Sequence, residues 1–290
     1  MNIKATTLIP FLFVWLWSTG FVGARFGLPY TEPFFILAVR LVLVVLAFGI
    51  LACILKSARL DRKKIAVQLL VGILLHGFYL GGVFYAISIG TPAGIAAIVV
   101  GMQPILSAVI NWVLFRSHVS KRQWVGLVLG FSGLLAVIFG SSEILTSDFG
   151  MIGLGACLLA LVGITFSTLI QRHYGAGTPL VTGAMWQNVS AAGLMLLATF
   201  VLETQTYQPT WQLGAALVWM VGPLSVLSIM LLMYMIKTGE MAKVTSYFYL
   251  VPPVAVIQTW FLFGETLSVL SMVGCGVVVM GVALVVRETR

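Results

Sequence analysis

The chain has 290 residues, of which 60% are hydrophobic and only 8% are charged. Its mean hydropathy is +1.10, so it carries more apolar surface than a soluble core could bury, and this excludes an ordinary soluble domain. The net charge is +8, but the distribution of the basic residues described below indicates a membrane topology rather than nucleic-acid binding. The composition therefore predicts an all-α polytopic membrane protein.

Helix-length apolar blocks follow one another along the whole chain. A block of about twenty apolar residues is long enough to cross a bilayer. We place ten such blocks at residues 8–27, 33–55, 65–87, 92–114, 123–140, 150–171, 180–202, 211–236, 241–264 and 267–286. The first block lacks the small-residue cleavage site of a secretory signal, so we expect it to be retained as a helix. Cys53, Cys157 and Cys275 lie in three different blocks and are predicted to be packing residues.

The basic residues predict the orientation of these ten spans. Fourteen of the sixteen lysines and arginines fall at the N-terminus, at the C-terminus or in the loops that share their side of the membrane. The two exceptions are Arg25, at the outer end of the first span, and Arg40, inside the second. Because cytoplasmic loops collect lysine and arginine, both termini are predicted to be cytosolic.

The second half of the chain repeats the pattern of the first. Residues 1–145 hold five predicted spans, and residues 146–290 hold five more. At an offset of 148 or 149 residues, Tyr85 matches Tyr234, Pro104 matches Pro252, and other identities follow in the same order. A unit with an odd number of spans must lie upside down relative to its copy. The sequence therefore predicts two inverted five-helix repeats, an arrangement typical of secondary transporters.

Prolines interrupt several spans near the predicted middle of the membrane. Proline frees a backbone carbonyl one turn earlier, and such groups are tolerated at membrane depth only against protein or a wet cavity. Kinking for packing alone is the alternative. The predicted helix-break or gating positions are Pro104, Pro223, Pro252 and Pro253.

Polar and aromatic side chains cluster at the same predicted depth. Such groups are unfavourable in hydrocarbon unless they are paired or hydrated, although a simple interhelical hydrogen bond is the alternative for each. His76 and Tyr79 are three residues apart and are expected on one helix face. The predicted substrate-binding residues are Trp17, Arg40, His76, Tyr79, Gln103, Ser225, Ser246 and Tyr247, with Gln187 and Asn188 as weaker candidates.

The charged residues limit the mechanism. No aspartate or glutamate lies at the predicted midplane, which disfavours cation–proton antiport through a membrane-embedded carboxylate. His76 is the midplane side chain whose ordinary pKa suits proton coupling, and a facilitator driven by the substrate gradient is the alternative. Arg40 suits a carboxylate, either of the protein, in a structural role, or of a substrate.

Several of these segments resemble the EamA branch of the drug/metabolite transporter superfamily. The similarity rests on residues 13–18 (FVWLWS), on Arg40 within residues 37–41 (LAVRL), on Pro104, and on the run that contains Pro252-Pro253, Gly264-Glu265, Gly274 and Gly281. It covers nearly the whole chain in two copies. The first half departs from the pattern, since it has Phe115-Arg116-Ser117 where a Gly-Glu pair is common. The resemblance implies a ten-helix transporter that works by alternating access, with a central cavity between the repeats and with the fifth and tenth helices at the periphery.

Together these features predict an exporter or facilitator of small amphipathic metabolites, with amino acids or related zwitterions as the expected substrates. Efflux of neutral or cationic toxic compounds, with Trp17, Tyr79 and Tyr247 as a stacking surface, is one alternative, and a membrane sensor or scramblase is another. An enzyme is not expected, because the sequence holds no HExxH, CxxC or P-loop motif. We expect no cofactor, no metal and no nucleic-acid partner. The expected setting is the bacterial inner membrane, crossed by a monomer or a homodimer.

Overall fold

The computed structural model describes residues 5–115, 120–140, 150–237 and 250–287. Within those ranges the regular structure is helical, apart from one isolated bridge between Thr31 and Tyr207. The first half contains α1 (Ala5–Gly27), η1 (Leu28–Tyr30), α2 (Pro33–Ile54), α3 (Arg62–Gly72), η2 (Ile73–Leu80), α4 (Gly81–Ser88), α5 (Ala93–Gly101), α6 (Gln103–Phe115) and α7 (Lys121–Gly140). The second half contains α9 (Gly150–Tyr174), α10 (Leu180–Leu202), α11 (Trp211–Trp219), η3 (Met220–Leu227), α12 (Ser228–Lys237), α14 (Val251–Phe263) and α15 (Val269–Arg287).

The helices bear out the predicted class. In the described part of the chain, eight helical stretches between Leu8 and Met235 are long and apolar enough to cross a membrane. Two shorter apolar helices, Val251–Phe263 and Val269–Leu284, lie where the ninth and tenth spans were predicted. Part of the predicted ninth span, residues 241–249, lies outside the described residues. The chain is therefore an all-helical, polytopic membrane protein, while the count of ten spans stays a prediction.

Three of the long spans are interrupted. The span from Ala93 to Val113 breaks at Met102, between α5 and α6, and Pro104 is the second residue of α6. The third and eighth spans each contain eight residues of wide π-helix, η2 and η3, and Pro223 lies inside η3. Pro252 and Pro253 are the second and third residues of α14, and the residues one turn before them, 248 and 249, lie outside the described part of the chain.

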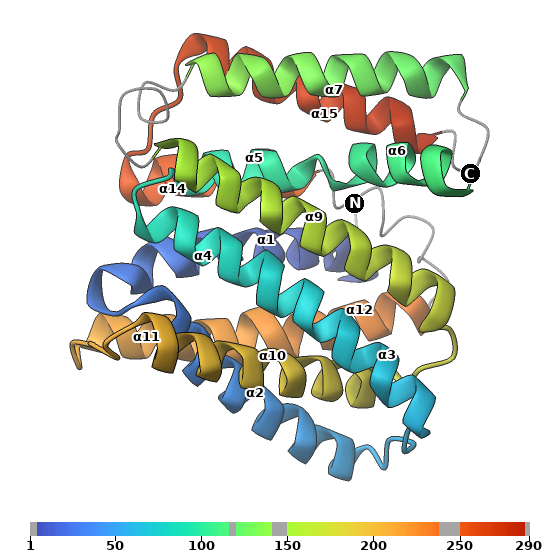
Figure 1. The fold of residues 1–290 in the computed structure, drawn as a ribbon, viewed down its shortest axis with the longest axis vertical. Helices are drawn as coiled ribbons and strands as arrows, with labels where there is room; N and C mark the ends of the chain where they lie inside the picture. The colour runs from blue at the N-terminus through green and yellow to red at the C-terminus, as the bar shows by residue number, and fades with distance from the viewer. Residues whose placement is uncertain (1–4, 116–119, 141–149, 238–249, 288–290) are drawn as a thin grey trace.

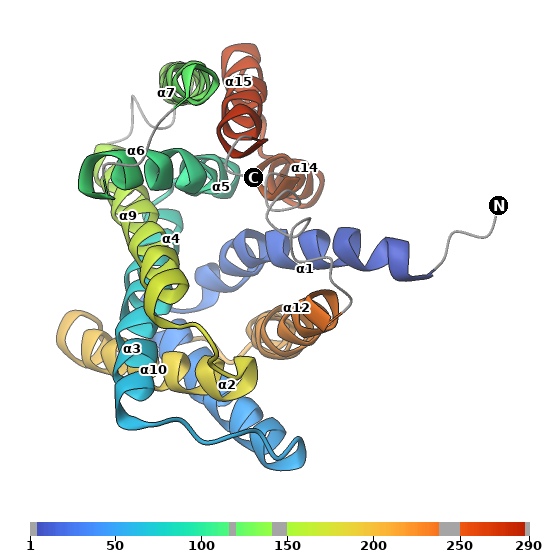
Figure 2. The same cartoon turned by 90° about the vertical axis from the view of Figure 1, so that its right-hand side faces the viewer.

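The helices are arranged around α1. Figure 1 shows α7 and α15 together at one end of the molecule and α2 at the other. In the perpendicular view of Figure 2, α1 lies between the α5–α14 pair and the group formed by α2, α10 and α12. Close packing joins α7 to α15, α10 to α2, and α14 to both α5 and α1. Because α7 and α15 pack mainly on each other, they contribute little to the centre of the molecule.

The contacts between the two halves are reciprocal. In the first half, α1 packs against the α11–η3–α12 stretch, and in the second half α9 packs against the α3–η2–α4 stretch. Likewise α2 contacts η3, and α10 contacts η2. Each half therefore completes its packing on the interrupted span of the other.

Glycines permit a backbone-to-backbone contact between α7 and α15. A Cβ added at Gly274 would meet the carbonyl oxygen of Gly133 at 2.7 Å and the amide nitrogen of Val137 at 2.8 Å. A Cβ at Gly281 would meet the carbonyl oxygen of Gly126 at 2.6 Å. These separations are shorter than any real Cβ contact, so only glycine allows the two helices to approach this closely.

We expect Gly274→Ala to destabilise the protein by about 1–3 kcal/mol, because the new methyl group would meet backbone atoms that have no room to move. The measurement is thermal unfolding of the purified protein in detergent. Gly276→Ala, in the same helix, is the matched control, since nothing lies within 4 Å of its added Cβ. Equal melting temperatures for the two variants would contradict the close approach.

Candidate functional site

A cavity of about 120 Å³ lies among α1, α2, η2, α4, α10, η3 and α12. Both halves of the chain line it, from Trp17 to Phe84 in the first and from Ala184 to Ile229 in the second. Most of the lining is aliphatic or aromatic. The exceptions are seven residues that carry a polar or charged group: Trp17, Arg40, His76, Tyr79, Gln187, Asn188 and Ser225.

The two π-helical segments supply much of this lining. η2 contributes Leu75, His76, Tyr79 and Leu80, and η3 contributes Leu224 and Ser225. A π-helix has wider turns than an α-helix and occurs frequently at functional sites. Irregular backbone at membrane depth is tolerated where it is buried in protein or lines a cavity, and both segments meet that condition.

Arg40 reaches the cavity from α2 and is buried, with 6% of its surface exposed. Its Nη2 donates to Ser225 Oγ at 3.3 Å, and its Nη1 lies 4.0 Å from Met220 Sδ. The Ser225 hydroxyl in turn donates to the Met220 carbonyl oxygen at 2.7 Å, which leaves its oxygen free to accept from Arg40. The Nε of Arg40 has no hydrogen-bond partner among the described residues.

An amide network adjoins the cavity at α10. Gln187 donates to Gln68 Oε1 at 2.6 Å, and Gln68 donates to Gln171 Oε1 at 3.1 Å. Asn188 donates to the carbonyl oxygen of Ala184 at 2.8 Å. The network joins α3, α9 and α10, and it holds α10 in the rotation that turns Gln187 and Asn188 toward the cavity.

The structure brings together five of the eight predicted substrate-binding residues, namely Trp17, Arg40, His76, Tyr79 and Ser225. Gln103 lies elsewhere and donates to Thr168 Oγ1 at 2.9 Å, which is the interhelical hydrogen bond considered as its alternative. Ser246 and Tyr247 lie outside the described residues. The apolar lining residues, such as Phe21, Phe48 and Phe84, could not be predicted from the sequence, because apolar residues occur throughout every span.

Carboxylates join loops of the two halves at one end of the bundle. Glu203, which follows α10, accepts hydrogen bonds from the backbone amides of Phe34 and Phe35 at 2.7 Å each and so caps α2. Glu32, which precedes α2, accepts from the amides of Thr204 and Thr206 at 3.1 and 2.8 Å. Burial alone would raise the pKa of Glu32, but these hydrogen bonds and those from the threonine hydroxyls outweigh it and lower the pKa below its ordinary value of 4.5.

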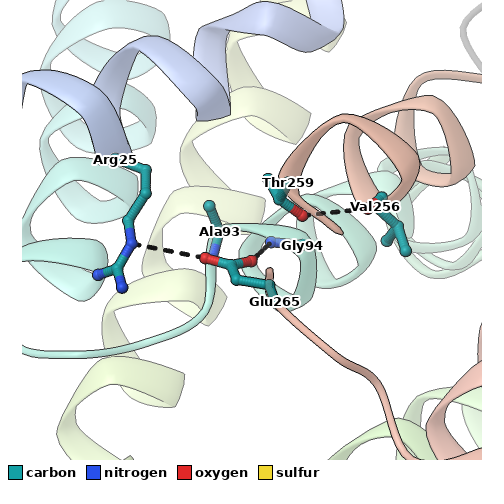
Figure 3. Close-up of polar contacts among 6 residues, drawn as sticks. All are labelled: Arg25, Ala93, Gly94, Val256, Thr259 and Glu265. Carbon is teal, nitrogen blue, oxygen red and sulfur yellow. Dashed lines mark hydrogen bonds and ion pairs between the residues drawn. The ribbon is translucent and has the colours of Figure 1, made fainter. Parts of the chain in front are cut away.

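A similar contact lies between α14 and α5 (Figure 3). Glu265 accepts hydrogen bonds from the amides of Ala93 and Gly94 at 3.2 Å, at the start of α5. Its Oε1 also lies 3.6 Å from Arg25 Nε, at the end of α1. We call Glu32, Glu203 and Glu265 the loop carboxylates; each one joins residues of the first half to residues of the second.

The described residues include no group of three histidine, cysteine, aspartate or glutamate side chains that could hold a metal ion. The cavity therefore presents one fixed cation, hydrogen-bonding groups and a large apolar surface. Such a lining can bind a small amphipathic molecule by orienting its polar end and burying the rest.

The sequence profile of the EamA-like transporter family matches residues 5–139 and 151–287. The chain is therefore a member of the EamA-like transporter family, and by this membership it is a membrane transporter. The match covers both halves, and it confirms the family resemblance drawn from the sequence.

Curated relatives agree with this membership. The chain is 30% identical to the uncharacterized inner membrane transporter YedA of Escherichia coli, over 93% of this chain and 87% of that protein. It is 26% identical to the uncharacterized transporter YdfC of Bacillus subtilis, with the same two shares. A match of 32% identity to the S-adenosylmethionine/S-adenosylhomocysteine transporter of Chlamydia trachomatis covers 51% of this chain and 46% of that one.

A known crystal structure, described only as that of a protein, has the same fold as this chain. It superposes with a TM-score of 0.66 at 19% sequence identity, over 97% of this chain and 96% of the other.

The loop carboxylates lead to a prediction on acid stability. Because the folded-state pKa of Glu32 is lowered, its contribution to stability is present above the unfolded value of about 4.5 and is lost as the pH falls through the folded value. We expect Glu32→Gln to melt at a lower temperature than wild type at pH 7, and the difference to shrink as the pH falls below the unfolded value of about 4.5. The measurement is thermal unfolding from pH 3.5 to 7.5; a difference that stays constant over this range would contradict the role of the charge.

Proposed function

We propose that this protein is an exporter or facilitator of small amphipathic metabolites, with amino acids and related zwitterions as its substrates. The observation that carries the proposal is the cavity between the two halves, in which Trp17 and apolar side chains surround a cluster of hydrogen-bonding groups. Apolar walls would hold a substrate side chain, and the polar cluster would hold its charged end.

The reciprocal packing supports transport by alternating access between two inverted repeats, residues 1–145 and 146–290. The stretches η2 and η3 interrupt the third and eighth predicted spans, which would be equivalent in such a repeat, and both line the cavity. An inverted repeat with its site at the interface can expose that site to either side by rocking one half against the other. We extend the proposal to ten spans with both termini in the cytosol.

The loop carboxylates are consistent with that orientation. They join the loops that the distribution of basic residues assigns to the outer side. We propose that these contacts close the outer side of the cavity and separate when it opens outward.

The relatives support a membrane setting for the protein. An inner membrane transporter of Escherichia coli is among them, and we propose the inner membrane of a bacterium for this chain, as a monomer or a homodimer. One relative is named for S-adenosylmethionine and S-adenosylhomocysteine, and both compounds carry an amino-acid group. This supports zwitterions over lipophilic cations, although that match covers half of the chain.

Efflux of cationic or neutral toxic compounds is the second candidate. Trp17 and Tyr79 offer aromatic faces to a cation, but Arg40 in the same lining would repel it. The absence of an acidic side chain from the described lining also disfavours this alternative.

Transport of labelled amino acids into proteoliposomes that contain the purified protein tests the proposal. Saturable uptake that unlabelled substrate accelerates from the inside is the expected result. A protein that stays folded and gives no saturable flux of any amino acid would contradict it, and scrambling of labelled lipid instead would favour the scramblase alternative.

His76→Ala should reduce this flux at least several-fold, because His76 lines the cavity and makes no hydrogen bond to a described residue that would give it a structural role. His173→Ala is the matched control, since His173 is exposed at the end of α9. We would measure initial rates at pH 6, 7 and 8. Equal rates for wild type and His76→Ala at all three values would remove this side chain from the site and from any proton coupling.

A further inference from the structure

Arg40 is a buried cation without a counter-ion in the described part of the protein. A guanidinium stays protonated in proteins, and removing its charge from water is strongly unfavourable unless an anion or several hydrogen bonds compensate it. Arg40 has one hydrogen bond to a neutral hydroxyl and one long contact to a sulfur atom. Its Nε has no hydrogen-bond partner among the residues that the structure describes, although the side chain lines the cavity. An anion in the cavity would supply the missing compensation.

The cavity offers much less to a positive group. No aspartate or glutamate belongs to its described lining. The acceptors that remain are neutral, such as the side-chain oxygen of Asn188, whose amide nitrogen already donates to Ala184. A substrate ammonium would therefore exchange water for neutral acceptors beside a fixed cation, whereas a carboxylate would exchange water for a charge-assisted hydrogen bond.

The position of Arg40 also connects the two halves. Arg40 belongs to α2, and its hydrogen bond to Ser225 holds the guanidinium against η3 of the second half. Ser225 is itself fixed by its bond to the Met220 carbonyl oxygen. The anion site is thus built from a buried, charged side chain that its hydrogen bond to the half-buried Ser225 orients.

Building on the proposed function, we propose that a carboxylate is the group that the site requires and that Arg40 binds it, while the amino group of a zwitterion is dispensable. Organic acids with an apolar side chain then bind alongside the corresponding amino acids. Amines of the same side chain, which lack the carboxylate, do not bind.

The test compares three compounds for each of three apolar groups. Leucine, 4-methylpentanoate and 3-methylbutylamine form the first set, and the phenylalanine and tryptophan sets are built in the same way. Thermal stability of the purified full-length protein is measured against concentration, because a ligand that binds the folded state raises the melting temperature. We expect the amino acid and the deaminated acid of at least one set to stabilise the protein within about tenfold of each other in concentration, and its amine to have no effect. Stabilisation by an amine, by amino acids without their deaminated acids, or by no compound at all would overturn the proposal.

Variants then assign the effect to Arg40. Arg40→Gln should weaken binding of both acids by about tenfold to a hundredfold, the range expected for loss of a charge-assisted hydrogen bond. Arg40→Lys keeps the charge, so it should retain the preference for acids over amines even if Arg40→Gln fails to fold. Arg172→Gln, at an exposed position of α9, is the matched control and should bind as wild type does. Wild-type affinity in a folded Arg40→Gln variant would overturn the assignment.

Flux measurements separate this proposal from the proposed function. Suppose that the amino acids and their deaminated acids bind through Arg40, but that neither the wild type nor any variant transports them across a proteoliposome membrane. The anion site then stands and the transport proposal fails. If Arg40→Gln transports amino acids as wild type does, the transport proposal stands and the anion site fails.

Discussion

The structure depends on the need to satisfy every backbone amide and carbonyl without water inside a bilayer. Within hydrocarbon, only helices meet that need along a single segment, and the described spans are helical apart from the break at Met102. Departures from the α-helix are then restricted to places where protein or a cavity surrounds the backbone. The π-helical segments η2 and η3 are such places, and they supply the chemically distinct side chains His76, Tyr79 and Ser225 to one cavity. The same constraint that excludes irregular backbone from the rest of the spans therefore allows irregular backbone at the cavity.

Two kinds of contact organise the helices around that site. At the α7–α15 pair, Gly133 and Gly274 allow the two backbones to come into contact. A close-packed pair of this kind has no second arrangement of similar fit, so we expect this contact to persist during transport. At the loops, Glu32, Glu203 and Glu265 accept hydrogen bonds from partly exposed amides across the two halves. Such contacts can exchange with water at modest cost. The proposed gate therefore lies among the loops, and the peripheral pair serves as a fixed support.

In the proposed anion site, the buried charge of Arg40 would determine which substrates the cavity prefers. A neutral cavity of this composition would bind amphipathic molecules of either sign, whereas Arg40 makes the interior favourable for an anion and unfavourable for a cation. Its contact with Ser225 places the charge between α2 and η3, so occupancy of the site would be sensed by both halves at once. A substrate that supplies the missing counter-charge would lower the free energy of the occupied site relative to the empty one.

The sequence by itself determined the class, because 60% apolar residues in helix-length blocks leave no other fold, and its family resemblance is confirmed by the profile match to both halves. It also pointed to the polar residues of the cavity, since a polar group at membrane depth stands out against an apolar background. Only the tertiary structure separated Gln103, which bonds to Thr168, from His76, which faces the cavity, because helix facing depends on partners distant in the chain. Pro223 indicates an interruption at η3 in the sequence, whereas η2 contains no proline and could not be predicted in this way. Its wide turns, and the approach of Glu203 and Glu265 to helix ends some 170 residues away, arise from packing between the halves.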